Sequence, residues 1–329
     1  MIRSIGMSSE GEIRINVNTS QYPEWIKNPE NLLWVDISGE PNREIESILL
    51  DDFNFHPLAV DDALVETHIP KVDDWTDYLY LVMRIVLLLE DREDLEIETP
   101  ELDVFLGSNY LVTYHKIPLT IIDTIWQMCQ RDSRTLAKGT GNLFYQIADE
   151  LINQYMPIME RIDELSDQIE DEVFDNPKPM VLNKIFSLKR ALLELRRALI
   201  PQREVFNKLA RKDFAIIRDQ DQVYYRDVYD HMVRLQEINE GLRDLISGAL
   251  ETYLSVVNNR MNEVMKTLTV ITTLFMPLSF LTGFFGMNFF QAAIPLKIWT
   301  GKLVFGLVLA GMIGIPFGMY LWMRRRNWM

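Results

Sequence analysis

The chain has 329 residues, with 33 Lys and Arg against 48 Asp and Glu, and a net charge of −15. Every acidic residue precedes Lys266, so residues 1–265 hold 27 basic against 48 acidic residues, a net charge of −21. This excess argues against nucleic acid as a partner, since phosphate binding needs basic groups. It suits metal cations, although solubility alone explains it equally well. The single cysteine, Cys129, excludes an intrachain disulfide and a cysteine-rich zinc site.

The first third of the chain alternates between strand-like and helix-like segments. Short runs rich in Val, Ile, Leu and Tyr predict strands at Glu12–Val17, Leu32–Ile37, Leu79–Leu89, Leu102–Leu106 and Tyr110–Tyr114. Short helices are predicted between them at Pro41–Leu50, His56–Val65 and Pro118–Gln130. The pattern indicates an α+β cytoplasmic domain over residues 1–137, a mixed sheet with helices on its faces.

Helices alone follow this domain. Asn142–Phe174 and Met180–Leu209 have the apolar spacing of helices, and the prolines between them cannot continue a helix. They predict a helical hairpin with an acidic tip over residues 138–212. A further helix is expected without a break from Val223 to Gly286, much longer than a bilayer is thick. Its first part, over residues 213–265, is therefore expected to be a cytoplasmic stalk.

Two uncharged runs, Thr267–Leu296 and Leu303–Met323, are long enough to cross a bilayer. They predict transmembrane helices over 266–286 and 303–323, an extracytoplasmic loop over 287–302 and a basic tail over 324–329. The N-terminus has no apolar core of signal-peptide length. Basic residues flank the stalk and tail sides of the two spans more than the loop side. A multi-pass protein of the cell (inner) membrane is expected, with both termini in the cytoplasm and membrane lipids around the two spans.

One face of the first predicted span is polar or small, with Met as the only bulky residue type. Its members recur at steps of three and four residues: Asn262, Met265, Thr269, Thr272, Met276, Ser279, Gly283 and Gly286. Close packing of helices explains such a face as well as a pore does. The amides at its two ends, Asn262 and Asn288, favour contact with water. A pore then requires several copies around an axis, because one hairpin cannot enclose water.

Neutral oxygens at the outer end of this face fit a divalent cation that keeps much of its water. Mg²⁺ dehydrates reluctantly and prefers oxygen ligands. The Gly286 carbonyl and the Asn288 amide offer hydrogen bonds to its hydration shell without replacing it, whereas carboxylates would hold the ion too long for conduction. Because no G-x-x-x-x-G-K-[ST] loop is present, membrane potential is the expected driving force.

The motif Gly286-Met287-Asn288 closes the first of two terminal spans. Further stretches accompany it: His56-Pro57-Leu58-Ala59, Pro70-Lys71-Val72, Tyr225–His231, and Asn262–Lys266 leading to Phe275–Leu278. With these motifs the chain resembles, over nearly its whole length, the CorA family of GMN-motif two-transmembrane magnesium transporters. The resemblance implies a homopentameric funnel with the first spans around the pore. It implies a transporter and not an enzyme, with no cofactor beyond transported and regulatory Mg²⁺.

The resemblance also implies residue roles. Gly286, Met287 and Asn288 form the selectivity filter. The positions that match the family's pore lining are Asn262, Met265, Leu268, Thr272, Met276, Ser279 and Asn288. Divalent ions between cytoplasmic subunits hold the gate shut, with Asp62 and Glu251 as one regulatory pair and Asp149 and Asp227 as a second. Glu251 stands where the family has aspartate, and Phe285 stands where it has tyrosine. The loop over 287–302 has no acidic residue.

Alternatives remain open at this stage. A zinc transporter of the ZntB type would share the fold, although Met287 favours the magnesium branch, and Co²⁺ and Ni²⁺ are further candidate ions. A membrane-tethered enzyme or adaptor is a third alternative, but it would not require a periodic polar face. The four histidines are scattered along the chain, and His231 is interpreted as a packing or hydrogen-bonding residue.

Overall fold

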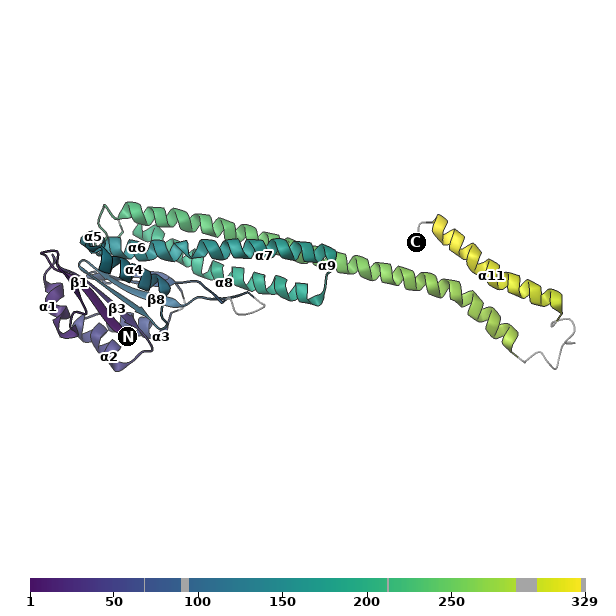
Figure 1. The fold of residues 1–329 in the computed structure, drawn as a ribbon, viewed down its shortest axis with the longest axis horizontal. Helices are drawn as coiled ribbons and strands as arrows, with labels where there is room; N and C mark the ends of the chain where they lie inside the picture. Colours follow the sequence, from purple (N-terminus) through teal and green to yellow (C-terminus); the bar gives the residue numbers. More distant parts are fainter. Residues whose placement is uncertain (68, 90–94, 212, 288–300, 327–329) are drawn as a thin grey trace. The chain divides into compact units, whose positions relative to one another are not determined.

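The computed structural model describes residues 1–67, 69–89, 95–211, 213–287 and 301–326 (Figure 1). The chain divides into two compact units, Met1–Leu250 and Glu251–Met329, and the boundary falls within one long helix. The predicted fold class is confirmed: a mixed-sheet domain is followed by a helical hairpin, a long helix and a second apolar helix.

A seven-stranded mixed sheet organises the first unit, in the order β2-β1-β3-β9-β8-β5-β4. The strands are β1 (Ile2–Met7), β2 (Ile13–Ile15), β3 (Leu32–Ser38), β4 (Lys71–Asp74), β5 (Tyr78–Arg84), β8 (Glu101–Gly107) and β9 (Tyr110–His115). Strands β3 and β9 pair in parallel, and the other neighbours pair antiparallel. A separate two-stranded sheet joins β6 (Leu87–Leu89) to β7 (Glu96–Glu98).

The strand predictions differ from the structure in three ways. Strands β1, β4 and β7 were not predicted, because short segments rich in charged or small residues lack the apolar runs used to identify strands. The predicted strand Leu79–Leu89 divides into β5 and β6, which pair with different partners. The predicted Glu12–Val17 strand shortens to β2, at one edge of the sheet.

Helices cover both faces of the sheet (Figure 1). One face packs on η1 (Thr19–Gln21), α1 (Tyr22–Lys27), α2 (Arg43–Ser47), the π-helical turn η2 (Ile48–Asp52) and α3 (Pro57–Val65). On this face Phe55 stacks on Phe105, with ring centroids 4.2 Å apart. The other face packs on α4 (Thr120–Arg131), α5 (Ser133–Ala137) and α6 (Thr140–Asn153). There the rings of Trp34 and Trp126 lie 5.1 Å apart. Side chains that alternate along β3 therefore serve both cores.

The helical hairpin consists of α7 (Tyr155–Asp175) and α8 (Pro179–Leu209). The predicted helix Asn142–Phe174 is interrupted at Gln154, between α6 and α7. A buried polar network joins the hairpin to the sheet: the Tyr155 hydroxyl donates to the Arg84 carbonyl at 2.9 Å, and the Arg84 N–H donates to Gln202 Oε1 at 2.7 Å. Because buried polar groups are costly without partners, this network fixes the base of the hairpin on the sheet.

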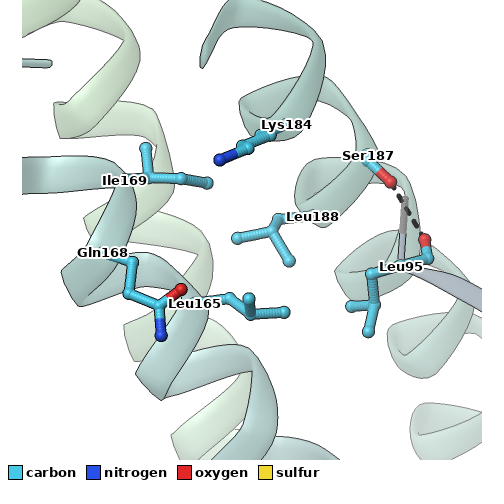
Figure 2. Close-up of a pocket in the computed structure, with 7 residues that line it drawn as sticks. All are labelled: Leu95, Leu165, Gln168, Ile169, Lys184, Ser187 and Leu188. Atoms are coloured by element: carbon cyan, nitrogen blue, oxygen red, sulfur yellow. Dashed lines mark hydrogen bonds between the residues drawn. The ribbon is translucent and has the colours of Figure 1, made fainter. Parts of the chain in front are cut away.

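A cavity of about 140 Å³ lies between α7 and α8, as Figure 2 shows. Its lining is mainly apolar, with Leu165, Ile169 and Leu188 on facing helices. The Lys184 ammonium at its edge is already paired with Glu172 at 2.6 Å. The cavity is therefore a gap in the packing of the hairpin with little charge to offer a ligand.

The long helix α9 (Gln222–Gly286) follows, and α11 (Lys302–Arg325) belongs to the second unit. Both contain stretches long and apolar enough to cross a membrane, with mean hydropathies of 1.7 and 2.0. The predicted spans over 266–286 and 303–323 thus lie within observed helices. The domain boundaries proposed from the sequence stay predictions.

Candidate conduction face and metal sites

Eight of the residues expected to line a pore lie on α9 and are exposed in the single chain. They are Asn262, Met265, Leu268, Thr269, Thr272, Met276, Ser279 and Gly283. In the expected filter, Gly286 is the last residue of α9 and the exposed Met287 follows it. Asn288 lies outside the described residues.

The threonine hydroxyls on this face donate to their own helix. Thr269 Oγ1 donates to the Met265 carbonyl at 2.7 Å, and Thr272 Oγ1 donates to the Leu268 carbonyl at 2.9 Å. Each hydroxyl has one hydrogen to donate and two lone pairs, so its oxygen is left to act outward as an acceptor. A hydrated cation presents the hydrogens of its water ligands, and acceptors are the groups that it needs. The local hydrogen bonds therefore suit the face to a hydrated cation.

Three metal-ligating side chains come together on α6 and α9. The ligand atoms of Asp149, Asp227 and His231 lie within 4.8 Å of one another. Asp149 is half-buried, while Asp227 and His231 are exposed. The structure therefore brings the second predicted regulatory pair together and adds a histidine. His231 is exposed beside two carboxylates, so it does not pack in the core. Its interpretation as a hydrogen-bonding residue stays a prediction, and ligation of a metal is a second role that its position allows.

Packing between α6 and α9 places this cluster. The Tyr225 hydroxyl donates to the Gly141 carbonyl at 2.7 Å, and the ring of Tyr225 lies 6.0 Å from that of Phe144. Val228 and Met232 continue the buried face of α9. Asp227 and His231 are four residues apart and so share the flank of this face, where they meet Asp149.

The donor set of the cluster combines carboxylate oxygen with imidazole nitrogen. Burial first, and then the charges of Asp149 and Asp227, raise the pKa of the neighbouring Tyr145, so its phenol stays protonated. Carboxylates suit Mg²⁺, whereas an imidazole favours Co²⁺, Ni²⁺ and Zn²⁺. The cluster is thus chemically able to hold either kind of divalent ion.

Asp62 belongs to the first predicted regulatory pair, and the ammonium group of Lys71 already lies beside it. Lys71 Nζ lies 2.5 Å from Asp62 Oδ2 and 2.7 Å from Asp73 Oδ2. Asp62 is on α3, whose first turn is capped by His56 Nδ1, which accepts from the Leu58 N–H at 3.2 Å. Lys71 and Asp73 are two residues apart on β4, so their side chains lie on the same side of the strand.

The expected partner of Asp62 is Glu251 of a neighbouring subunit. Glu251 is exposed and is the first residue of the second unit. The pairing of Asp62 with Glu251 stays a prediction.

Two side chains at these sites, His231 and Lys71, were not predicted from the sequence to take part in metal binding. The four-residue spacing from Asp227 to His231 was a usable signal for the first. No local pattern signals the second, since the contact between Lys71 and Asp62 joins a helix to a strand.

Comparison with known proteins places the chain among metal transporters. The model of the family described as CorA-like Mg²⁺ transporter protein matches residues 29–325. YfjQ of Bacillus subtilis (strain 168) is 33% identical over 295 residues, covering 90% of this chain and 89% of that protein. The cobalt/magnesium transport protein CorA of Thermotoga maritima is 32% identical over 297 residues, covering 90% and 83%.

The fold agrees with these relatives. The solved CorA magnesium transporter of Methanocaldococcus jannaschii superimposes with a TM-score of 0.80, covering 99% of this chain and 98% of that one at 23% identity. The chain therefore belongs to the family of CorA-like Mg²⁺ transporter proteins, and it is a divalent cation transporter and not an enzyme.

Proposed function

We propose that the chain conducts Mg²⁺ into the cytoplasm down its electrochemical gradient, with Co²⁺ and Ni²⁺ as further permeant ions. The observation that supports this most is that Thr269 and Thr272, on an uncharged helix face, use their hydroxyl hydrogens within the helix and so keep only acceptor capacity for an ion's water shell. Neutral acceptors bind the water shell of a divalent ion weakly enough to release it. For an ion that dehydrates as reluctantly as Mg²⁺, this avoids the main barrier to passage.

The proposal requires several subunits. A face of acceptors cannot stay in contact with lipid, because unsatisfied polar groups are costly there. Five copies of α9 around an axis would turn Asn262, Thr272 and Ser279 toward a common pore. Gly286, Met287 and Asn288 would form its outer filter. In this arrangement both termini are cytoplasmic and the protein resides in the cell membrane.

The proposed gate responds to cytoplasmic divalent ions. Asp62 would meet Glu251 of a neighbouring subunit through a bound ion, and Asp149, Asp227 and His231 would hold a second ion within one subunit. The second site is supported by the convergence of its ligand atoms within 4.8 Å. When internal Mg²⁺ is plentiful, both sites fill and stabilise the closed state, so that influx limits itself.

Ion flux into liposomes that contain the purified protein tests the conduction proposal. Mg²⁺, Co²⁺ and Zn²⁺ would be compared at equal concentration and membrane potential, with Asn288→Ala as the filter variant. We expect Mg²⁺ flux that rises with inside-negative potential and is lost in Asn288→Ala. Equal flux in that variant would contradict the filter assignment. Flux of Zn²⁺ without Mg²⁺ would favour the zinc alternative. Chemical crosslinking in the same liposomes counts the subunits.

A further inference from the structure

A lysine occupies the carboxylate that the proposed regulation at Asp62 requires. Lys71 Nζ lies 2.5 Å from Asp62 Oδ2, with 31% of the lysine and 40% of the aspartate side chain exposed. An ammonium and a divalent cation compete for the same oxygen lone pairs, and like charges repel when both are close. A metal ion reaching Asp62 must therefore displace this ammonium or bind against its charge.

Lys71 has other partners that would remain after it loses Asp62. Asp73 Oδ2 lies 2.7 Å from Lys71 Nζ. The ring of Tyr80 lies 5.2 Å from the same nitrogen, within the range of a cation–π contact. Tyr80 is itself fixed, because its hydroxyl donates to Asp103 at 2.6 Å in the buried sheet. Lys71 can thus release Asp62 and remain paired, without moving its strand.

We propose that Lys71 is a built-in competitor for the divalent cation at Asp62 and sets the internal concentration at which the transporter closes. The inference rests on the proposed function, in which Asp62 is a regulatory ligand. In the open state, at low internal Mg²⁺, Lys71 neutralises Asp62. As internal Mg²⁺ rises, the ion binds Asp62, and Lys71 loses this contact and keeps its pairing with Asp73. Competition raises the concentration of Mg²⁺ that half-closes the transporter above the value that Asp62 alone would give.

The test is the inhibition of flux by Mg²⁺ placed on the cytoplasmic side of liposomes that hold the full-length protein. Lys71→Met removes the charge and keeps a side chain of similar length over Tyr80. We expect the half-inhibiting concentration to fall about two- to fivefold, the change that corresponds to loss of a partly exposed ion pair. Lys71→Arg keeps the charge and should stay within about twofold of the unmodified protein. Each curve is normalised to its own uninhibited flux, so a smaller folded fraction changes the amplitude and not the midpoint.

Two controls distinguish competition between Lys71 and Mg²⁺ for Asp62 from a general effect of removing a positive charge. Lys116→Met removes a cation paired with Glu66 at 3.4 Å in the same unit and should leave the midpoint unchanged. A shift as large as that of Lys71→Met would overturn the proposal. In an Asp62→Asn background, Lys71→Met should have no further effect, because the contested carboxylate is gone.

The outcomes also distinguish this inference from the function on which it rests. If Asp62→Asn shifts the midpoint but Lys71→Met does not, Asp62 is a regulatory ligand and the competitor role is wrong. If Asp62→Asn leaves the midpoint unchanged, the regulatory role of Asp62 fails, and the competitor role fails with it. If Lys71→Met yields no folded protein, Lys71→Gln removes the same charge and carries the same expectation.

Discussion

His115 Nε2 lies 3.2 Å from Asp36 Oδ1, in the interior of the sheet where β3 and β9 run in parallel. The other ring nitrogen, Nδ1, lies 2.6 Å from the Ile117 carbonyl. Arg3 Nε donates to Asp36 Oδ2 at 2.8 Å, and Thr113 donates to Oδ1 at 2.7 Å. A buried carboxylate on β3 thus contacts side chains of both neighbouring strands, β1 and β9.

The first prediction concerns this carboxylate. Burial alone would raise the pKa of Asp36, but the hydrogen bond and charge of His115, with Thr113 and Arg3, hold it below its ordinary value. The pair therefore stabilises the fold above about pH 4, the ordinary range of aspartate. That stability is lost as pH falls toward the lowered value. Asp36→Asn should cost about 3 kcal/mol at pH 7, since it removes the buried carboxylate that accepts from the largely buried Arg3 guanidinium and from Thr113.

Urea unfolding of the detergent-solubilised protein at pH 7 and at pH 3.5 measures this effect. The difference between Asp36→Asn and the unmodified protein should shrink at the lower pH. Asp123→Asn is the matched control, because Asp123 contacts the same Arg3 at 2.6 Å but is 51% exposed. It should cost less than about 1 kcal/mol. Equal losses in the two variants would show that burial is not what makes Asp36 important.

The second prediction has the opposite dependence on pH. Burial, and next the charge of Glu101, raise the pKa of Asp103 well above its ordinary value, so the fold favours the neutral acid. Its stabilising contribution is complete below about pH 4 and is lost as pH rises through the raised pKa. Asp103→Asn keeps the shape, removes the charge and leaves an oxygen for the Tyr80 hydroxyl. We expect this variant to unfold at a higher temperature than the unmodified protein at pH 8, and the gap should close at pH 4.

Thermal unfolding across this pH range is the measurement. Each pKa unit of the shift corresponds to about 1.4 kcal/mol. A lower melting temperature for Asp103→Asn at pH 8 would mean that the carboxylate is ionised and compensated in the fold.

The third prediction concerns the imidazole of the cluster on α6 and α9. Removing His231 takes away the one nitrogen ligand among the three residues of the cluster and leaves both carboxylates. His231→Ala should therefore weaken Co²⁺ binding by about tenfold, or about 1.4 kcal/mol, while Mg²⁺ binding changes much less. Calorimetric titration of the solubilised protein with each ion measures the difference. His56→Asn is the control, since it replaces another exposed histidine with a residue that can also cap α3. Parallel losses for both ions would argue against direct ligation by His231.

The fourth prediction concerns the conduction face. Thr272→Val keeps the shape of the side chain but removes its acceptor oxygen, and Thr272→Ser restores it. A hydrogen bond lost to the hydration shell is worth about 1 kcal/mol, so Mg²⁺ flux should fall about fivefold in the valine variant and recover in the serine variant. Thr267→Val is the control. Thr267 makes the same kind of bond, to the Glu263 carbonyl at 2.9 Å, but lies off the polar face. Mg²⁺ flux into liposomes at fixed membrane potential is measured for the three variants. An equal loss of flux in Thr267→Val would contradict the assignment of the polar face to conduction.

Much of the helical architecture follows from the sequence by itself. The helix predicted from Val223 to Gly286 is observed as Gln222–Gly286, and the helix predicted from Met180 begins one residue earlier. The polar face of α9 was equally predictable. Helical periodicity and charge-free runs depend only on residues a few positions apart, so a local pattern carries the information.

The tertiary structure decided the rest. It added β1 and β4, which have little apolar pattern and owe their place to neighbouring strands. It placed Lys71 on Asp62, brought His231 to two carboxylates, and joined His115 to Asp36 across 79 positions of sequence. Such contacts depend on which strands pair, in which register, and on how helices pack over them. Those choices minimise the free energy of the whole core, and no short window of sequence contains them.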